Sequence, residues 1–316
     1  MIKTSICSLG TFFAIGLFSS FSPQLSSETT EKPQKQYYQM GAHGEFEVTQ
    51  GYRQDNLNSS ISKHKKNPKR TSKVSFRDVR IYQTRIASKF TMNDYFLKIG
   101  LGYGDIRSGH VHGSQFKKAD KKENDRAKVR GSYTADAKLS WGKNFALGST
   151  VTIAPLVGYL WEIEKLRFKN GRQIKEGHSK RLHDLNSTYK ARWNAPFIGL
   201  DASYDPLKKL SVYGEYNFLF AVKDHARGFW NLRSHQHGMH FEQRSRRSKG
   251  FGHFGLAGVG YEWIDNLWLK LEYQFLWLEA KGGKTKGKEH HHKFSSPFHK
   301  SRLMSQEVRL CVEYAM

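Results

Sequence analysis

The sequence predicts an all-β protein, a ten-stranded antiparallel transmembrane β-barrel over residues 42–316. Segments of strict two-residue alternation recur along the chain, and one face of each is apolar and rich in aromatic residues. The connections between these segments are short and long in turn. Hydrophobic residues make up 38% of the chain, which suits a barrel in which alternate strand residues face lipid.

The first 27 residues have the pattern of a secretory signal peptide. Lys3 supplies the positive charge, and an apolar run from Ile6 to Phe21 follows it. Residues 28–41 are polar and predict a short periplasmic lead-in. No later run is long and apolar enough to predict a membrane helix. Cleavage would leave Cys311 as the remaining cysteine, so a disulfide framework is excluded.

Four strands are expected in the first half of the barrel. In the first, Phe46, Val48 and Tyr52 share one face, and charged residues occupy the other. The second has a weak pattern, and the third alternates Leu and Ile with glycine and lysine. The fourth carries Arg130, Asp136 and Lys138 on its polar face. The predicted ranges are Ala42–Asn56, Val74–Phe90, Tyr95–Tyr103 and Val129–Trp141.

Six further strands complete the prediction. Pro196 disturbs the alternation in one of them and predicts a bulge. The clearest alternation is LWLKLEYQFLWLE, in which Leu, Tyr, Phe and Trp alternate with Lys270, Glu272 and Gln274. The predicted ranges are Thr150–Glu164, Thr188–Tyr204, Leu210–Lys223, Phe251–Ile264, Leu267–Glu279 and Ser301–Met316.

Ten strands leave nine connections. Four are short turns, and five are long loops at 57–73, 109–128, 165–187, 223–250 and 281–302. Short periplasmic turns and long extracellular loops are typical of bacterial outer-membrane barrels. An even strand number also returns both ends of the barrel to the periplasmic side. The sequence therefore predicts a location in the bacterial outer membrane, among outer-membrane lipid and lipopolysaccharide.

The positive charge is concentrated in the predicted loops. The chain has a net charge of +24, and the five loops hold 33 Lys and Arg residues against 8 Asp and Glu residues. A basic rim attracts polyanions and steers anions toward the barrel mouth. The expected partners are lipopolysaccharide phosphates, sulfated host glycans or small anionic solutes, and no nucleic acid is expected. The candidate polyanion-binding residues are Lys63, Lys65, Lys66, Lys69, Arg70, Arg244, Arg246, Arg247, Lys284, Lys286 and Lys288.

The predicted lumen carries charges of both signs. Buried charges must be paired, so we expect a network of ion pairs across the interior. The interior of a barrel of about eight strands is filled by its own side chains, and a barrel of ten strands is slightly wider. A narrow or loop-gated conduit is therefore allowed. The candidate lumen charges are Arg130, Asp136, Lys138, Glu215, Lys270, Glu272 and Arg309.

Histidine clusters and one Asp-His pair are candidate reactive sites. Thirteen of the 15 histidines lie in the predicted loops, where solvated basic chains are the simpler interpretation, and we expect no metal and no cofactor. The barrel resembles the omptins, ten-stranded outer-membrane proteases, in architecture. Omptins separate their Asp and His by one residue, whereas Asp224 and His225 are adjacent and face opposite ways. Asp105 stands alone where an acidic pair would be needed, so we expect no enzyme.

Three segments suggest a family. GYRQDNL (Gly51–Leu57), FRDVRIYQ (Phe76–Gln83) and RWNAPFIGLDASY (Arg192–Tyr204) resemble the Protochlamydia outer membrane protein family. The resemblance implies a surface barrel of about ten strands, with porin activity proposed for some members, and it transfers no catalytic residues. Two functions follow as expectations: a narrow, anion-leaning porin-like channel, or a surface adhesin that binds polyanions through basic loops.

Overall fold

The computed structural model describes residues 42–62, 70–117, 120–175, 178–231, 239–246, 249–289 and 292–316. The predicted signal peptide (1–27) and lead-in (28–41) lie outside these residues. No helix within the described ranges is long and apolar enough to cross a membrane. The strands are β1 (Ala42–Ser62), β2 (Arg70–Met92), β3 (Tyr95–Lys117), β4 (Asp120–Val129), β5 (Ser132–Lys143), β6 (Phe145–Leu147), β7 (Val151–Lys175), β8 (His178–Leu207), β9 (Leu210–Phe220), β10 (Lys223–Trp230), β11 (Met239–Ser245), β12 (Phe251–Ile264), β13 (Leu267–Lys281), β14 (Gly283–Glu289) and β15 (His292–Ala315).

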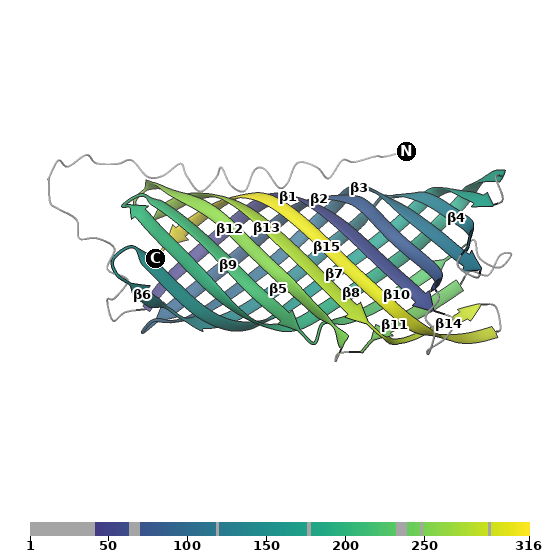
Figure 1. The fold of residues 1–316 in the computed structure, drawn as a ribbon. Coiled ribbons are helices and arrows are strands. Elements are labelled where there is room, and N and C mark those ends of the chain that lie inside the picture. Colours follow the sequence, from purple (N-terminus) through teal and green to yellow (C-terminus); the bar gives the residue numbers. More distant parts are fainter. Residues whose placement is uncertain are drawn as a thin grey trace, which may run out of the picture. The chain divides into compact units, whose positions relative to one another are not determined.

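Ten of these strands form a closed antiparallel ring, as the alternation predicts. The hydrogen-bonded order is β1-β2-β3-β5-β7-β8-β9-β12-β13-β15, and β15 pairs back to β1 (Figure 1). The β1–β15 seam runs from Glu45↔Ala315 to Ile61↔Phe298. Closure leaves this ring without an exposed strand edge, which is the requirement for a sheet that crosses a membrane.

Four strands of the ring break and then continue beyond the break. β5 is preceded by β4, β9 is followed by β10, β12 is preceded by β11, and β13 is followed by β14. The continuations pair with one another and with the longer strands, so a second ring follows, β1-β2-β3-β4-β7-β8-β10-β11-β14-β15. Positive φ angles mark three of the breaks, at Gly131 (62°), Ala221 (51°) and Gly282 (64°). These positions act as bulges that redirect the strand.

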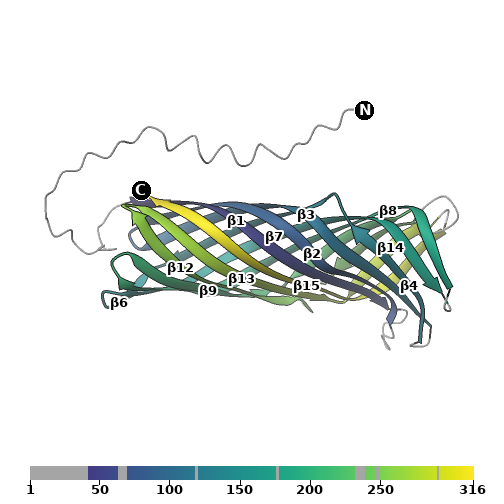
Figure 2. The ribbon, with the colours of Figure 1, turned by 90° about the horizontal axis from the view of Figure 1, so that it is seen from above.

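The prediction of five long loops is wrong for most of the residues that the structure describes. Residues 57–62, 70–73, 109–117, 120–128, 165–175, 178–187, 223–230, 239–245, 281, 283–289 and 292–302 are strand. The barrel therefore continues well past the membrane, and β4, β11 and β14 lie at the end opposite the C-terminus (Figures 1 and 2). The physical reason is backbone hydrogen bonding. In strands, the N–H and C=O groups of these polar segments bond to the neighbouring strands, whereas in loops they would bond to water.

The lipid-facing surface is a band of apolar side chains bounded by aromatic residues. On β3 the outward residues Tyr95, Leu97, Ile99, Leu101 and Tyr103 are all more than 40% exposed. Eight residue steps in a strand tilted by about 40° span about 20 Å, close to the apolar height of an outer-membrane barrel. Tyr95 stacks on Trp141 at one edge and Tyr103 on Tyr133 at the other, with ring centroids 5.7 and 5.9 Å apart.

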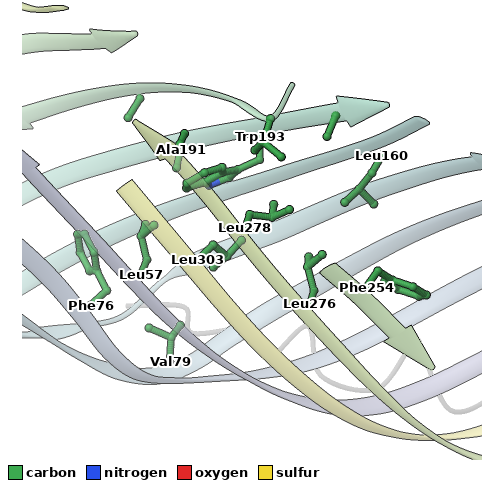
Figure 3. Packing of buried hydrophobic residues seen from close by; sticks show 14 of the residues in the cluster. Leu57, Phe76, Val79, Leu160, Ala191, Trp193, Phe254, Leu276, Leu278 and Leu303 are labelled. Carbon is green, nitrogen blue, oxygen red and sulfur yellow. The ribbon is translucent and has the colours of Figure 1, made fainter. Parts of the chain in front are cut away.

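Beyond this band, the apolar residues change from the outer face to the inner face. On β13 the lipid-facing Leu271 and Tyr273 are followed by the inward Leu276 and Leu278, which are almost fully buried. The same inversion occurs on the other long strands. The inward side chains meet in a core inside the outer half of the barrel, and Figure 3 shows Leu57, Phe76, Trp193, Leu278 and Leu303 pointing into it from different strands.

The short connections identify the periplasmic end. Asn93–Asp94, Lys208–Lys209 and Asp265–Asn266 turn the chain within two residues at the end where the C-terminus lies (Figure 1). In outer-membrane barrels the short turns are periplasmic, and by this rule we call the apolar-filled half of this barrel the extracellular half.

Candidate functional site

A buried arginine connects distant walls of the barrel. The Arg53 guanidinium on β1 donates to both carboxylate oxygens of Asp55, at 2.8 and 2.6 Å. It also donates to Glu162 on β7 at 2.8 Å and to the Gln83 side chain on β2 at 3.2 Å. Because β1 and β7 are not neighbours in either ring, the Arg53–Glu162 ion pair crosses the lumen. Such a pair is tolerated in an interior because the charges have hydrogen-bonded partners of opposite sign.

Further polar contacts span the interior nearer the periplasm. Arg85 on β2 donates to Asp136 on β5 and to Gln274 on β13, both at 2.9 Å. Lys138 on β5 donates to Glu215 on β9. These strands are separated by at least one other strand in the ring, so the contacts run through the lumen and not along the wall.

The structure places six of the seven predicted lumen charges inside the barrel: Asp136, Lys138, Glu215, Lys270, Glu272 and Arg309. The exception is Arg130, which is exposed, and the prediction for it is wrong. Arg130 lies at the break between β4 and β5, where the positive φ of Gly131 resets the alternation. Val129 therefore faces inward in its place, and the guanidinium points away from the lumen.

The extracellular half of the lumen is filled by apolar and aromatic groups. Phe76 on β2 packs against Tyr189 on β8, with ring centroids 5.2 Å apart, and against Phe168 on β7 at 6.0 Å. Above them the Ser59 hydroxyl on β1 donates to the Gln243 side chain on β11 at 3.1 Å. The interior thus holds a polar layer toward the periplasm and an apolar layer beyond it, and both bring opposite walls into contact.

One group of described side chains has the spacing of metal ligands. Ligand atoms of Glu47, Glu272 and Cys311 lie within 4.8 Å of one another in the lumen. Both carboxylates already have partners: Glu272 accepts from Arg309 and Tyr213, and Glu47 accepts from the Thr49 hydroxyl at 2.9 Å. The nearby cations supply the charge compensation that a metal ion would otherwise supply.

The outer wall of the extracellular half carries a second concentration of charge. Strand register places outward side chains of six adjacent strands, β7, β8, β10, β11, β14 and β15, in three cross-strand rows. The rows are Ile163–Arg192–His225–Arg244–Lys284–Pro297, then Lys165–Lys190–Arg227–Glu242–Lys286–Ser295, then Arg167–Thr188–Phe229–His240–Lys288–Lys293. We call this surface the basic wall. Its 18 positions hold ten Lys and Arg residues and one carboxylate.

The single carboxylate of the basic wall is surrounded by cations. Glu242 accepts hydrogen bonds from Arg244 at 2.9 Å and from Arg227 at 3.1 Å, and its oxygen lies 2.6 Å from Nε2 of His225. The hydrogen bonds from Arg244 and then His225 lower the pKa of Glu242 to about 2. The remaining cations of the wall have no acidic partner within the three rows.

A groove of about 850 Å³ lies on the basic wall. Its lining includes seven cationic or imidazole side chains, Gly228 and Gly287, and the aromatic rings of Phe229, Phe241 and Phe294. Phe229 and His240 lie directly opposite each other on β10 and β11, with ring centroids 4.5 Å apart and an interplanar angle of 31°. These seven side chains are Lys165, Lys190, Arg227, His240, Lys286, Lys288 and Lys293.

The predicted polyanion-binding residues fall into two groups. Lys63, Lys65, Lys66, Lys69 and Arg247 lie outside the described residues, as does the side chain of Arg70. Arg244, Lys284, Lys286 and Lys288 are exposed on the basic wall, and Arg246 is exposed at the break before β12. The prediction missed the wall cations supplied by β7, β8, β10 and β15: Lys165, Arg167, Lys190, Arg192, Arg227 and Lys293.

The Asp-His pair does not form a reactive dyad. Asp224 is 1% exposed and faces the interior, and burial raises its pKa to about 7. His225 faces outward and contacts Glu242. Asp105 pairs with Arg107 on the surface at 3.2 Å. The two members of the pair are therefore on opposite sides of the wall, as their adjacency in a strand requires.

Comparison with known proteins agrees with this architecture. The outer membrane protease OmpT from Escherichia coli is similar, with a TM-score of 0.73 and 12% identity, over 87% of this chain and 97% of that one. The outer membrane protein OprG from Pseudomonas aeruginosa matches with a TM-score of 0.36 and 11% identity, over 86% of this chain and 96% of that one. At these identities the likeness to OmpT shows the fold alone.

A search of curated proteins gave no match. The family model of the Protochlamydia outer membrane protein matches residues 47–316, which is nearly the whole barrel. Together with the ten-stranded ring and its apolar band, this match shows that the chain belongs to the Protochlamydia outer membrane protein family and is an outer-membrane β-barrel protein.

Proposed function

We propose that this barrel is a cell-surface protein that binds sulfated glycans through its basic wall. The observation that carries the proposal is the register of six adjacent strands, which gathers ten Lys and Arg residues around one carboxylate. Like charges placed opposite each other in a sheet repel, so the bare wall is electrostatically unfavourable. A bound polyanion relieves this repulsion, and the release of counterions adds to affinity.

The direction of the rows favours a partner outside the membrane. Arg167, at one end of the third row, lies six residues beyond Trp161, the last lipid-facing aromatic residue of β7, which is about 15 Å at the usual strand tilt. Lys293, at the other end of the same row, lies fifteen residues from the lipid-facing Val308 of β15, which is about 38 Å. The rows therefore climb away from the lipid headgroups toward β15. Lipopolysaccharide phosphates could reach the lower end, whereas a long soluble polyanion could follow the whole row.

The filled lumen favours surface binding over a channel. Cross-lumen contacts at Arg53–Glu162 and Lys138–Glu215 and the Phe76–Tyr189 packing occupy successive levels of the interior. A narrow anion-leaning channel would need these contacts to open. We expect planar-bilayer recordings of the purified protein to show no conductance steps, and steady steps would support the channel in place of the adhesin.

Binding to immobilised heparin, measured over a salt series, tests the proposal. The test variant combines Arg227→Gln, Lys286→Gln and Lys288→Gln on the basic wall. We expect at least a tenfold loss of affinity and a weaker salt dependence, because fewer counterions are released.

The matched control removes the same charge from strands outside the basic wall, as Arg77→Gln, Arg126→Gln and Lys128→Gln on β2 and β4. These side chains are also exposed, and we expect less than a threefold change. Equal losses in both triple variants would mean that general charge drives binding. Affinity for lipopolysaccharide vesicles without affinity for heparin would identify the membrane lipid as the partner.

A further inference from the structure

An aromatic pair lies within the groove of the basic wall. Phe229 on β10 and His240 on β11 occupy opposed outward positions in the row of Arg167, Lys288 and Lys293. The ring centroids are 4.5 Å apart, and both residues line the groove. This row lies beyond the lipid-facing band, so lipid contact does not explain an outward phenylalanine there.

Cations flank the pair on two sides. Lys288 lies directly opposite His240, and Lys293 lies directly opposite Lys288. In the next row, Arg227 and Lys286 lie on either side of Glu242. A ligand whose flat apolar face rests on the aromatic pair would therefore hold its anionic groups near lysine ammonium groups at the rim.

We infer that this groove is a subsite for one sulfated sugar ring, with the apolar face of the pyranose on Phe229 and His240 and its sulfate between Lys288 and Lys293. The inference rests on the proposed function. It adds that the protein recognises the sugar ring of the ligand by its shape, in addition to the charge of the sulfate. Aromatic side chains provide an apolar face with a defined orientation, whereas lysine alone attracts any anion. A nucleobase could also stack, but binding of a single strand uses successive aromatic platforms, and the outward positions of the three rows present one, the pair of Phe229 and His240.

The test compares two probes of similar charge, a heparin-derived oligosaccharide and linear polyphosphate, which has no ring. Phe229→Ala is expected to weaken binding of the oligosaccharide about tenfold, which is the range of one aromatic contact, and to change polyphosphate binding less than twofold. His240→Ala is expected to show the same pattern more weakly. Retained heat-modifiable mobility on gels shows that each variant is a folded barrel.

The outcomes separate this inference from the broader proposal. Loss of both probes in equal measure, or of neither, overturns the sugar subsite while polyanion binding stands. A wild-type protein that binds neither probe overturns the proposed function itself. A loss confined to single-stranded DNA, tested as a third probe, would replace the sugar by a nucleobase.

Discussion

Removal of the Arg53 guanidinium should strongly destabilise the barrel. Arg53→Met keeps an apolar chain of similar length but deletes the bonds to Asp55, Gln83 and Glu162. Both carboxylates are 2% exposed or less, so water cannot replace the lost partner. Breaking a buried pair by removing one partner costs about 3–5 kcal/mol.

The free energy of unfolding falls with urea concentration by about 2 kcal/mol per M. A loss of about 4 kcal/mol therefore lowers the urea concentration at the unfolding midpoint by about 2 M. Unfolding from lipid vesicles can be followed by the fluorescence of Trp193 and the other tryptophans.

Arg107→Met is the matched control, because Arg107 pairs with Asp105 on the surface, where both side chains are about half exposed. An exposed pair contributes about 0–1 kcal/mol, so its midpoint should move by less than about 0.5 M. Equal shifts for Arg53→Met and Arg107→Met would refute the view that a buried cross-lumen ion pair holds the walls together.

Three further outcomes are expected. Burial raises the pKa of Asp224 from 3.8 to about 7, so the folded state loses stability as pH rises through that window, and Asp224→Asn should resist urea better than wild type at pH 8 but not at pH 4. Glu242→Gln should tighten heparin binding severalfold at pH 7, because it removes the one carboxylate of the basic wall. Gly158→Ala should cost about 1–3 kcal/mol in urea unfolding, because a methyl group there overlaps the carbonyl oxygen of Leu139, whereas Gly255→Ala, with open space around it, should cost less than 1 kcal/mol.

The membrane-embedded part of the fold was predictable because the apolar residues of each strand stay on the same, outward face throughout this part. Lipid selects apolar residues on the outward face, so Leu269, Leu271 and Tyr273 define both the strand and its orientation. The same phase assigns Lys270 and Glu272 to the lumen, and the structure places them there. The same reasoning gave the wrong side for Arg130, because Gly131 has a positive φ and shifts the alternation of inward and outward residues by one.

The extracellular half was missed because its pattern is inverted. On β7, beyond the predicted strand end at Glu164, the buried Leu166 and Phe168 alternate with the exposed Lys165 and Arg167, which is a two-residue period with the apolar side facing inward. A search for apolar outer faces interprets such a segment as a polar loop. The signal that could have found the basic wall is a change of phase within one strand, from apolar outside to apolar inside.

The rows of the basic wall lay beyond sequence reasoning for a different reason. A row depends on which residues of six strands lie opposite each other, and one-residue changes in register would face half of them inward. Lys165 and Lys286 are 121 positions apart, yet belong to one row. Composition could indicate a basic outer end but not the neighbours of each charge.

Labelling of Cys311 can report when the β1–β15 seam closes. Its thiol faces the lumen from β15, the last strand, and is 2% exposed. It lies opposite Thr49 on β1 and Lys270 on β13. A thiol reagent can reach it while β15 is unpaired and loses access once the first and last strands join. In a Cys7→Ser chain, the rate at which labelling is lost would therefore time the final step of assembly in the membrane.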